Sequence, residues 1–360
     1  MADMQELLQH LMEVRGSDLH VKAGAAPHVR VDGRLHATPF AAVEPDRIAE
    51  MANEIMPAAR AEEFAKSGEA DFAYSVFGLG RFRVNVYRQR GSVGLVVRRV
   101  VPGIPSWDEL GLPLSVERIA DEQRGLIIVA GPTGSGKTTT VNAIIDRING
   151  TRAVHILTIE DPIEYLHTDK CAIISQREIG TDTASFREAM RRALRQGPDV
   201  VYIGELSDVE TLGAALSAAE TGHLVLSTMG TTTAAETVAR LVDFFPPIQQ
   251  KQARHALAGS LRAVIAQRLL ERADGKGRIA AVEVLVNTAK MYECIADPDR
   301  QSALDRVIAE GDYYGMQTFD QALLHLLTEG MVSFREGLAV ATQPEDLRIA
   351  LQQAGLAVPH

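Results

Sequence analysis

The segment from Gly125 to Ile148 limits the possible fold and function of this chain more than any other. Its centre, GPTGSGKT from Gly131 to Thr138, fits the pattern G-x-x-x-x-G-K-[S/T]. A short apolar run, GLIIVA, precedes the glycine loop and a helical pattern follows it, so the motif has the strand–loop–helix context that it needs. We therefore expect a nucleoside triphosphate to bind here, and a chance match in a loop that binds nothing is the less favoured interpretation.

The residue types in this loop suit phosphate binding. Glycine adopts backbone conformations that other residues resist, so the loop's N–H groups can surround a β-phosphate. The helix that follows directs its positive end at the same phosphates. Lys137 adds charge for the β- and γ-phosphates, and Thr138 offers a hydroxyl to Mg²⁺. With ATP and Mg²⁺ as the expected ligands, the predicted binding residues are Gly131, Pro132, Thr133, Gly134, Ser135, Gly136, Lys137, Thr138 and Thr139.

Composition narrows the class of protein. The 360 residues are 46% hydrophobic and 23% charged, which is ordinary for a globular chain of two or three domains. The net charge of −10 argues against a general attraction to nucleic acid or anionic lipid, so we expect no direct nucleic-acid binding. The two cysteines form no C-x-x-C pair, which fits a reducing compartment. No apolar run approaches the roughly 20 residues of a membrane span. We expect a cytoplasmic protein without membrane insertion, held at the inner membrane only through partners.

The pattern of residues divides the chain into an α+β part and an α/β part. In residues 1–100, apolar and polar side chains alternate on both sides of Asp32–Gly33, which is a hairpin signal. Helical patterns follow near 46–56 and 58–66, and apolar and polar side chains alternate again in RFRVNVYRQR. There Arg81 and Arg83 share one face of the expected strand, opposite Phe82. Residues 101–117 hold three prolines and two glycines between 101 and 113, and are predicted to be an interdomain linker.

Residues 118–285 are predicted to form an α/β domain with a mainly parallel sheet. Apolar strands alternate with helical patterns: GLIIVAG, VHILTIED, DVVYIGEL and HLVLSTM are the strands, and SFREAMRRALRQG and SDVETLGAALSAAETG are the helices between them. After about residue 247 we expect mostly helix, with GRIAAVEVLV as a strand. Residues 286–360 are predicted to be a helical C-terminal region.

Four carboxylates are expected near the glycine loop. Glu160 and Asp161 end the second strand, Glu164 lies just beyond, and Glu205 ends the third strand. Because the carboxyl ends of parallel strands meet on one rim, these residues should lie beside the loop. One carboxylate would help to hold Mg²⁺ and another would orient or deprotonate the attacking water. For Asp161 and Glu164, a role as helix cap or solvated loop acid is an equal alternative.

At this point the chain resembles a known family. The segments SDLH, RFRVNVY, GPTGSGKTTT, TIEDPIEYLH, QGPDVVYIGE, AAETGHLVLST and GMQTFDQAL occur in this order. Together they resemble the secretion ATPases of the type IV pilus and type II secretion superfamily, and in particular its PilT-like retraction ATPases. The assembly ATPases of that superfamily are longer and usually carry a tetracysteine zinc motif, which this chain lacks.

The resemblance implies a PAS-like N-terminal domain, followed by a RecA-like P-loop ATPase domain with a helical C-terminal tail, in a homohexameric ring. It implies that Glu160 is the catalytic glutamate, that Glu205 is the acid beside Mg²⁺, and that His223 is the first histidine of a nucleotide-site motif. Arginines of the N-terminal domain, here Arg81, Arg83 and Arg98, would reach the triphosphate. A solvated, edge-protecting face is an equal alternative for each arginine. The implied partners are an inner-membrane pilus platform protein and other pilus ATPases.

The chain also departs from the family pattern. Ser207 stands where an arginine is usual, Gly230 replaces a second histidine, and NTAKMYECIADP keeps little of a box that matters for retraction. Ser207 with Glu210, and Thr233 with Glu236, match capping boxes, so both helices are expected to start normally. A lost positive charge near the phosphates would slow the reaction.

Three functions follow from these observations. The favoured one is a hexameric ATP-hydrolysing motor that powers type IV pilus retraction and twitching motility through the platform protein. The alternative is a weakly active or inactive ATP-binding accessory subunit that regulates a pilus or secretion motor, which Ser207 and Gly230 would favour. The third is a motor for another machine, such as DNA uptake, conjugation or protein secretion. No N-K-x-D motif supports a GTPase.

Overall fold

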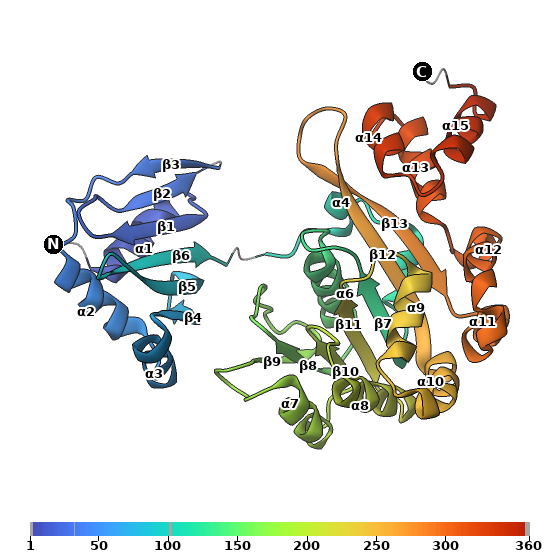
Figure 1. The fold of residues 1–360 in the computed structure, drawn as a ribbon, viewed down its shortest axis with the longest axis horizontal. Coiled ribbons are helices and arrows are strands. Elements are labelled where there is room, and N and C mark those ends of the chain that lie inside the picture. The colour runs from blue at the N-terminus through green and yellow to red at the C-terminus, as the bar shows by residue number, and fades with distance from the viewer. Residues whose placement is uncertain (1–2, 32, 101–102, 357–360) are drawn as a thin grey trace. The chain divides into compact units, whose positions relative to one another are not determined.

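The chain folds into two compact units, which divide between Gly103 and Ile104. The computed structural model describes residues 3–31, 33–100 and 103–356. Figure 1 shows the two units and the order of their elements. The segment 104–119, most of which was expected to be a linker, carries the short helices α4 (Trp107–Leu110) and α5 (Leu114–Ile119) and belongs to the second unit.

The N-terminal unit is an antiparallel sheet with helices on one face. The strand order is β3-β2-β1-β6-β5-β4. On β5, Phe82, Val84 and Val86 are buried, and the residues between them face the other way. The strands are β1 (Asp18–Lys22), β2 (His28–Val31), β3 (Arg34–Ala37), β4 (Glu69–Val76), β5 (Gly80–Gln89) and β6 (Ser92–Arg99), and the helices are α1 (Met4–Glu13), α2 (Pro45–Ile55) and α3 (Ala58–Ser67).

The second unit is built on a seven-stranded sheet, with the order β13-β12-β7-β11-β10-β8-β9. Every neighbouring pair is parallel except β12 and β13, which confirms the expected mainly parallel sheet. The strands are β7 (Gly125–Ala130), β8 (His155–Glu160), β9 (Ile173–Glu178), β10 (Val200–Ile203), β11 (Leu224–Met229), β12 (Leu261–Glu271) and β13 (Arg278–Val286).

Helices cover both faces of this sheet. Helices α5 and α6 (Lys137–Thr151) pack on one face and α7 to α12 on the other, and the last three helices pack on β12 and β13. The helices are α7 (Phe186–Ala193), α8 (Val209–Glu220), α9 (Ala234–Asp243), α10 (Pro247–Ser260), α11 (Ala289–Ala296), α12 (Leu304–Ala309), α13 (Phe319–Thr328), α14 (Phe334–Val340) and α15 (Pro344–Gln353). Short 3₁₀ helices are Leu194–Gln196, Pro298–Ala303 and Asp312–Tyr314.

The sequence pattern missed two strands. We expected helix after residue 247 apart from one strand, but β12 spans Leu261–Glu271 and lies inside the sheet, between β13 and β7. Because β12 is buried on both sides, its apolar residues run almost continuously and show no period of two. Strand β9 is a partly exposed edge strand with the polar sequence IISQRE, so it also lacks a clear pattern.

Neither predicted capping box forms in full. Asp208, not Ser207, caps helix α8, and its side chain accepts a hydrogen bond from the Thr211 N–H at 2.8 Å. Thr233 does cap helix α9, accepting from the Glu236 N–H at 3.1 Å. Glu236 itself accepts from the Thr232 N–H. Both helices therefore start on a proper cap, although Ser207 contributes nothing to it.

Candidate nucleotide-binding site

The glycine loop connects β7 to α6 and has the backbone that its sequence predicts. Gly131, Gly134 and Gly136 all have positive φ angles, at 148°, 80° and 89°. A side chain on Gly131 is excluded on a second ground, because its Cβ would lie 2.4 Å from the carbonyl oxygen of Gln267. Helix α6 begins directly after the loop at Lys137, so its first N–H groups face the loop's concave side.

Lys137 folds back over this loop. Its Nζ donates hydrogen bonds to the carbonyl oxygens of Gly131 at 2.8 Å and Pro132 at 3.0 Å. Burial lowers the pKa of Lys137, and the nearby carboxylates of Glu205 and Glu164 oppose that shift. An anion placed in the loop would meet an ammonium group that is already directed toward the loop.

The structure brings the glycine loop and the predicted carboxylates together around one cavity of about 280 Å³. The lining residues are Thr133, Lys137, Thr138, Glu160, Asp161, Pro162, Glu164, Phe186, Tyr202, Gly204, Glu205, Thr228 and Gly230. Other cavities on the surface are larger, but this one alone among those described contains the glycine loop. Asp161 and Glu164 line the cavity too, although the sequence left their role open.

Glu160 is the buried acid of the site. It is 2% exposed, at the end of β8, and accepts hydrogen bonds from the Thr158 hydroxyl at 2.6 Å and the Gln176 Nε2 at 3.2 Å. Burial raises its pKa to about 7, although the two hydrogen bonds favour the ionised form. A carboxylate that titrates near neutral pH is suited to accept a proton from water.

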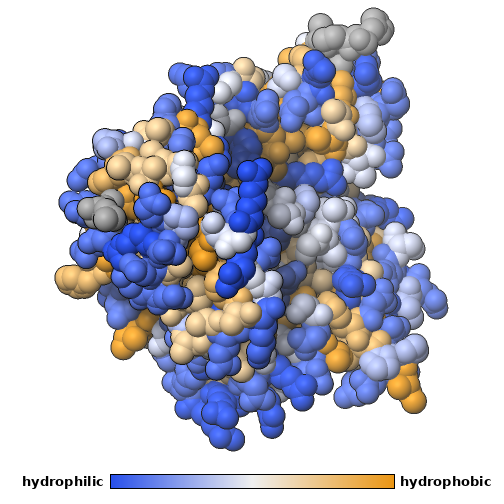
Figure 2. All heavy atoms as spheres, turned by 60° about the vertical axis from the view of Figure 1, so that its left-hand side comes forward, coloured by the Kyte–Doolittle hydropathy of each residue, from blue (hydrophilic) through white to orange (hydrophobic). Residues whose placement is uncertain are grey.

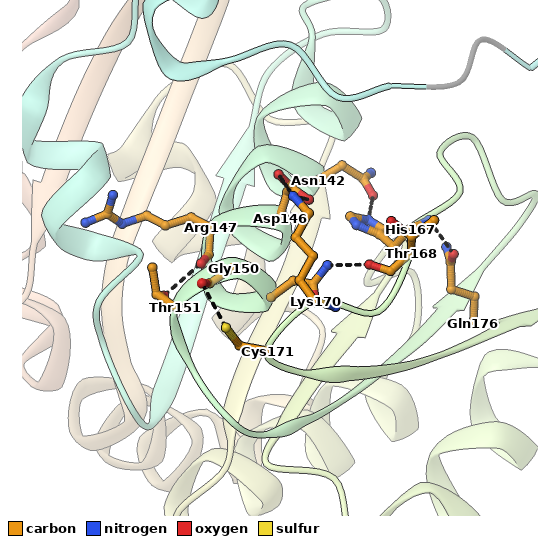
Figure 3. Close-up of polar contacts among 11 residues, drawn as sticks. Asn142, Asp146, Arg147, Gly150, Thr151, His167, Thr168, Lys170, Cys171 and Gln176 are labelled. Atoms are coloured by element: carbon orange, nitrogen blue, oxygen red, sulfur yellow. Dashed lines mark hydrogen bonds and ion pairs between the residues drawn. The ribbon is translucent and has the colours of Figure 1, made fainter.

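The segment from Asp161 to Ala172 is held against helix α6. His167 Nε2 lies 2.7 Å from the Asn142 side-chain oxygen, and the Asn142 amide donates to the Thr138 carbonyl at 2.8 Å. Because Asn142 donates through its nitrogen, its oxygen accepts, and His167 is the donor. The Tyr165 hydroxyl also meets the Thr139 hydroxyl at 2.9 Å. Figure 3 shows the contacts around Asn142 and His167.

Asn149 fastens the second half of that segment. It is fully buried, its amide donates to the Thr168 carbonyl at 2.8 Å, and its side-chain oxygen accepts from the Lys170 N–H at 3.0 Å. Its own carbonyl accepts from the N–H groups of Cys171 and Ala172. A single residue of α6 therefore fixes the chain that leads from the cavity into strand β9.

The cavity is acidic in its own right. Its described lining residues include four carboxylates, Glu160, Asp161, Glu164 and Glu205, but Lys137 is the single lysine or arginine among them. Carboxylate and hydroxyl oxygens are the ligands that Mg²⁺ prefers. Thr138 and Glu205 line the cavity together, so the donors present fit a magnesium ion.

The predicted arginines lie in the N-terminal unit. Arg81 and Arg83 are on β5, and Arg98 lies directly opposite Arg83 on β6. Arg98 Nε lies 2.7 Å from the buried carboxylate of Asp18, which also pairs with Arg30 at 3.4 Å. Two cations facing each other across a strand pair repel. Asp18 reduces that repulsion because its carboxylate pairs with Arg98.

The structure does not bring His223 to this cavity. His223 precedes β11, and the cavity residues of that strand lie at its other end, near Thr228 and Gly230. At about 3.3 Å per residue, six strand residues separate His223 from that rim by roughly 20 Å. Its ring nitrogen Nδ1 lies 3.0 Å from the carbonyl of Ala218 instead.

Sequence reasoning missed several residues of the site. Tyr202 and Phe186 line the cavity, but in the sequence they are only apolar positions within an expected strand and an expected helix. Gln176 contacts Glu160 from β9, and Gln267 contacts the glycine loop from β12, the two strands that the pattern did not reveal. A polar residue inside an apolar run, such as Gln267 in AVIAQRLL, was the available signal.

Figure 2 draws one face of the molecule, coloured by hydropathy. Hydrophilic side chains predominate on the face drawn there, and apolar side chains form small groups between them. The large apolar side chains that are most exposed, Phe77, Ile248 and Tyr313, belong to different elements or turns. Within the described residues, no helix has the length and apolar character that crossing a bilayer would require.

Comparison with known proteins gives consistent results. The family model described as type II/IV secretion system protein matches residues 112–294. The chain is 40% identical to the type IV pilus retraction ATPase PilT of Pseudomonas aeruginosa over 344 residues, which cover 96% of this chain and 99% of that protein. It is 39% identical to the type IV pilus ATPase PilU of the same organism, covering 97% of this chain and 91% of that protein.

A solved structure agrees along the same length. The crystal structure of the pilus retraction motor PilT with bound ADP matches with a TM-score of 0.89 at 40% identity, covering 97% of this chain and all of that chain. The relatives match this chain in sequence and the solved structure matches it in fold. The chain also brings a glycine loop, a lysine and a buried glutamate together around one cavity. The chain belongs to the type II/IV secretion system protein family, as a PilT-like type IV pilus retraction ATPase.

Proposed function

We propose that this protein is an ATP-hydrolysing motor that powers type IV pilus retraction, and with it twitching motility. The observation that carries the proposal is the cavity in which the glycine loop, Lys137 and Thr138 meet the buried Glu160, in a chain similar to PilT along almost its full length. A binding protein without chemistry has no need for a buried carboxyl group whose pKa is near 7.

Each residue has a proposed role in hydrolysis. The N–H groups of the glycine loop and the ammonium of Lys137 hold the β- and γ-phosphates of ATP. Thr138 and Glu205 hold Mg²⁺, which neutralises charge on the phosphates when bound. Glu160 accepts a proton from the water that attacks the γ-phosphorus, and the bond to the ADP oxygen breaks.

More positive charge is needed than the cavity supplies. ATP brings further negative charge to a cavity lined by four carboxylates and one lysine. Even with Mg²⁺, a transition state with negative charge on the γ-phosphate oxygens needs additional cations. We therefore propose that Arg81, Arg83 and Arg98 contact the triphosphate. His223 stays a proposed residue of the nucleotide site, although it lies at the opposite end of β11 from this cavity.

The larger assembly is proposed on the same basis. The N-terminal unit, with residues 1–100, would be a PAS-like domain. The second unit would be a RecA-like domain over 118–285, on which helices α4 and α5 pack, with a helical region over 286–360. Six copies would form a ring in the cytoplasm, bound to an inner-membrane platform protein and to other pilus ATPases. Hydrolysis would change the angle between the domains and move the platform protein.

A weakly active accessory subunit is the second candidate. Gly230 lines the cavity without a side chain, and Ser207 is exposed two residues beyond Glu205. Neither position supplies the charge or the hydrogen-bonding ring that the family pattern has there. Such a subunit would bind ATP through the intact glycine loop and turn it over slowly.

Steady-state ATP hydrolysis tests the proposal. We expect the wild-type protein to release phosphate, Glu160→Gln to bind ATP without turnover, and Lys137→Ala to lose nucleotide binding. The Glu160→Gln protein, purified in parallel, reveals any contaminating ATPase. Tight binding with wild-type turnover no higher than that of Glu160→Gln would favour the accessory subunit over the motor.

A further inference from the structure

Gln267 is a buried polar residue that contacts the glycine loop from behind. It lies on β12, beside β7, and is 2% exposed. Its Nε2 donates to the Ser135 carbonyl oxygen at 2.6 Å, and its Oε1 accepts from the Thr140 hydroxyl at 2.9 Å. Because the Ser135 carbonyl can only accept a hydrogen bond, it fixes which end of the amide faces the loop, and the Thr140 hydroxyl donates to the other end.

The bond to Ser135 also sets the direction of the next N–H group. The peptide unit between Ser135 and Gly136 is planar and trans, so its C=O and N–H point in opposite directions. Gln267 holds the carbonyl toward β12, so the Gly136 N–H points away from β12, and no described residue accepts a hydrogen bond from it. The next residue along the chain, Lys137, lines the cavity.

Glycine at positions 131 and 136 leaves the space that Gln267 needs beside the loop. A Cβ on Gly136 would lie 3.0 Å from Gln267 Nε2, and one on Gly131 would lie 2.4 Å from the Gln267 carbonyl oxygen. The loop therefore packs directly on Gln267, and no side chain separates the two. A residue that only filled space in the sheet would have no need of an amide here, because an apolar side chain of the same size would avoid the loss of its hydration.

We propose that Gln267 is a positioning residue for nucleotide binding, which holds the Ser135 carbonyl away from the cavity so that the Gly136 N–H faces the β-phosphate. The inference rests on the proposed nucleotide-binding function and adds a residue to it. The residue does not touch the phosphate; it acts through the backbone of the loop. Its contribution is to the affinity for any nucleotide with a β-phosphate.

The test compares two variants with a control in the full-length protein. Gln267→Met keeps the volume and loses both hydrogen bonds, and Gln267→Asn keeps an amide that is one methylene too short to reach Ser135. Thr140→Val is the control, because it removes the other hydrogen bond of Gln267 and leaves the Ser135 contact. Calorimetric titration with ADP and Mg²⁺ gives the affinity, and thermal unfolding without nucleotide gives the stability.

We expect both Gln267 variants to bind ADP roughly tenfold or more weakly, the size of one lost hydrogen bond to an ionised ligand. Thr140→Val should change the affinity less than about threefold, since the bond to Ser135 stays. With ATP, Gln267→Met should lower kcat/KM at least tenfold and Thr140→Val less than about threefold, because the β-phosphate belongs to the ADP leaving group and its contact is kept or strengthened in the transition state. If Gln267→Met does not fold, Gln267→Asn gives the same comparison.

Three results would overturn the inference, and each has a different meaning. If the wild-type protein binds ADP and the Gln267 variants bind it equally well with a lower Tm, Gln267 serves only the stability of the sheet. If the wild-type protein fails to bind ADP, the proposed function and this inference fall together. Weakened binding in Thr140→Val that equals the loss in Gln267→Met would also contradict the assignment to Ser135.

Discussion

Thr158 and Glu160 lie on the same face of strand β8, and the Thr158 hydroxyl donates a hydrogen bond of 2.6 Å to the Glu160 carboxylate. Burial disfavours the charged form of Glu160 and raises its pKa to about 7, whereas the hydrogen bond from Thr158 favours the charged form and lowers the pKa. The proposed base is therefore partly protonated at neutral pH. Its environment should be visible in the pH dependence of both activity and stability.

Activity should rise with pH through the range near 7. The base must be ionised to accept a proton, so kcat/KM for ATP should rise about tenfold per pH unit below about 7 and level off above it. A pH–rate profile of the free enzyme between pH 5.5 and 8.5 measures this. A profile that is flat across pH 7 would show that Glu160 is not the group that must lose a proton.

The contribution of Glu160 to folding stability should fall as pH rises, whereas activity should increase. A carboxyl group whose pKa is raised by folding stabilises the folded state fully below its unfolded value of 4.5, and this stability is lost as pH rises through about 7. Glu160→Gln stays neutral throughout. The Tm difference between wild type and Glu160→Gln should therefore shift in favour of the variant from pH 5 to pH 8. An unchanged difference would contradict the raised pKa.

Thr158→Val should move the acidic limb of activity to higher pH. The valine keeps the shape and removes the hydrogen bond that favours the ionised carboxylate, so the midpoint should rise by roughly one pH unit. Thr158→Ser keeps the hydroxyl and serves as the matched control, with a midpoint close to that of the wild type. Equal midpoints for the serine and valine variants would sink the idea that this bond tunes Glu160.

The start of helix α8 gives a prediction with a neighbouring control. Asp208→Ala should lower the free energy of unfolding by about 1 kcal/mol, since it removes the side chain that caps Thr211. Ser207→Ala should change it by less than about 0.5 kcal/mol, because Ser207 is exposed and makes no cap. Urea unfolding of both variants measures the difference, and a larger loss in Ser207→Ala would restore the capping box that the sequence suggested.

Replacing Asn149 should lower the free energy of unfolding more than removing the neighbouring ion pair between Lys170 and Asp146. Asn149→Ala leaves the partly buried N–H of Lys170 and the carbonyl of Thr168 without their partner, which should cost about 2 kcal/mol, or about 1 kcal/mol for each hydrogen bond. Lys170→Ala removes only an ion pair to Asp146 that is partly exposed on both sides, and should cost less than about 1 kcal/mol. Thermal unfolding compares the two variants. Equal losses would mean that Asn149 does not fasten the segment that follows Glu160.

The sequence predicted the parts of the site that local patterns encode. The glycine loop, Glu160 and Glu205 were all identifiable, because a motif or the end of an apolar strand marks each of them. Gln176 and Gln267 were not, because one lies on a polar edge strand and the other on a strand buried on both sides. Neither strand shows alternation, and a side chain's contact across more than 100 residues of chain depends on strand order, which local pattern does not contain.

The cap of α8 failed for a different reason. Ser207 and Asp208 are both good capping residues, and the spacing to Glu210 favoured the first. The structure uses Asp208, whose carboxylate receives both the N–H and the hydroxyl of Thr211. A one-residue difference in where a helix begins is decided by how the preceding strand ends, and spacing alone does not carry that information.

The two hydrogen bonds of Lys137 to its own loop have a consequence for how charge is placed in the site. Gly131 and Pro132 offer the ammonium two acceptors within the motif itself. The long, flexible lysine side chain is therefore held in one place by the backbone of the loop that it serves. One short segment of chain thus supplies both a phosphate's N–H donors and the support for the cation that the phosphate meets.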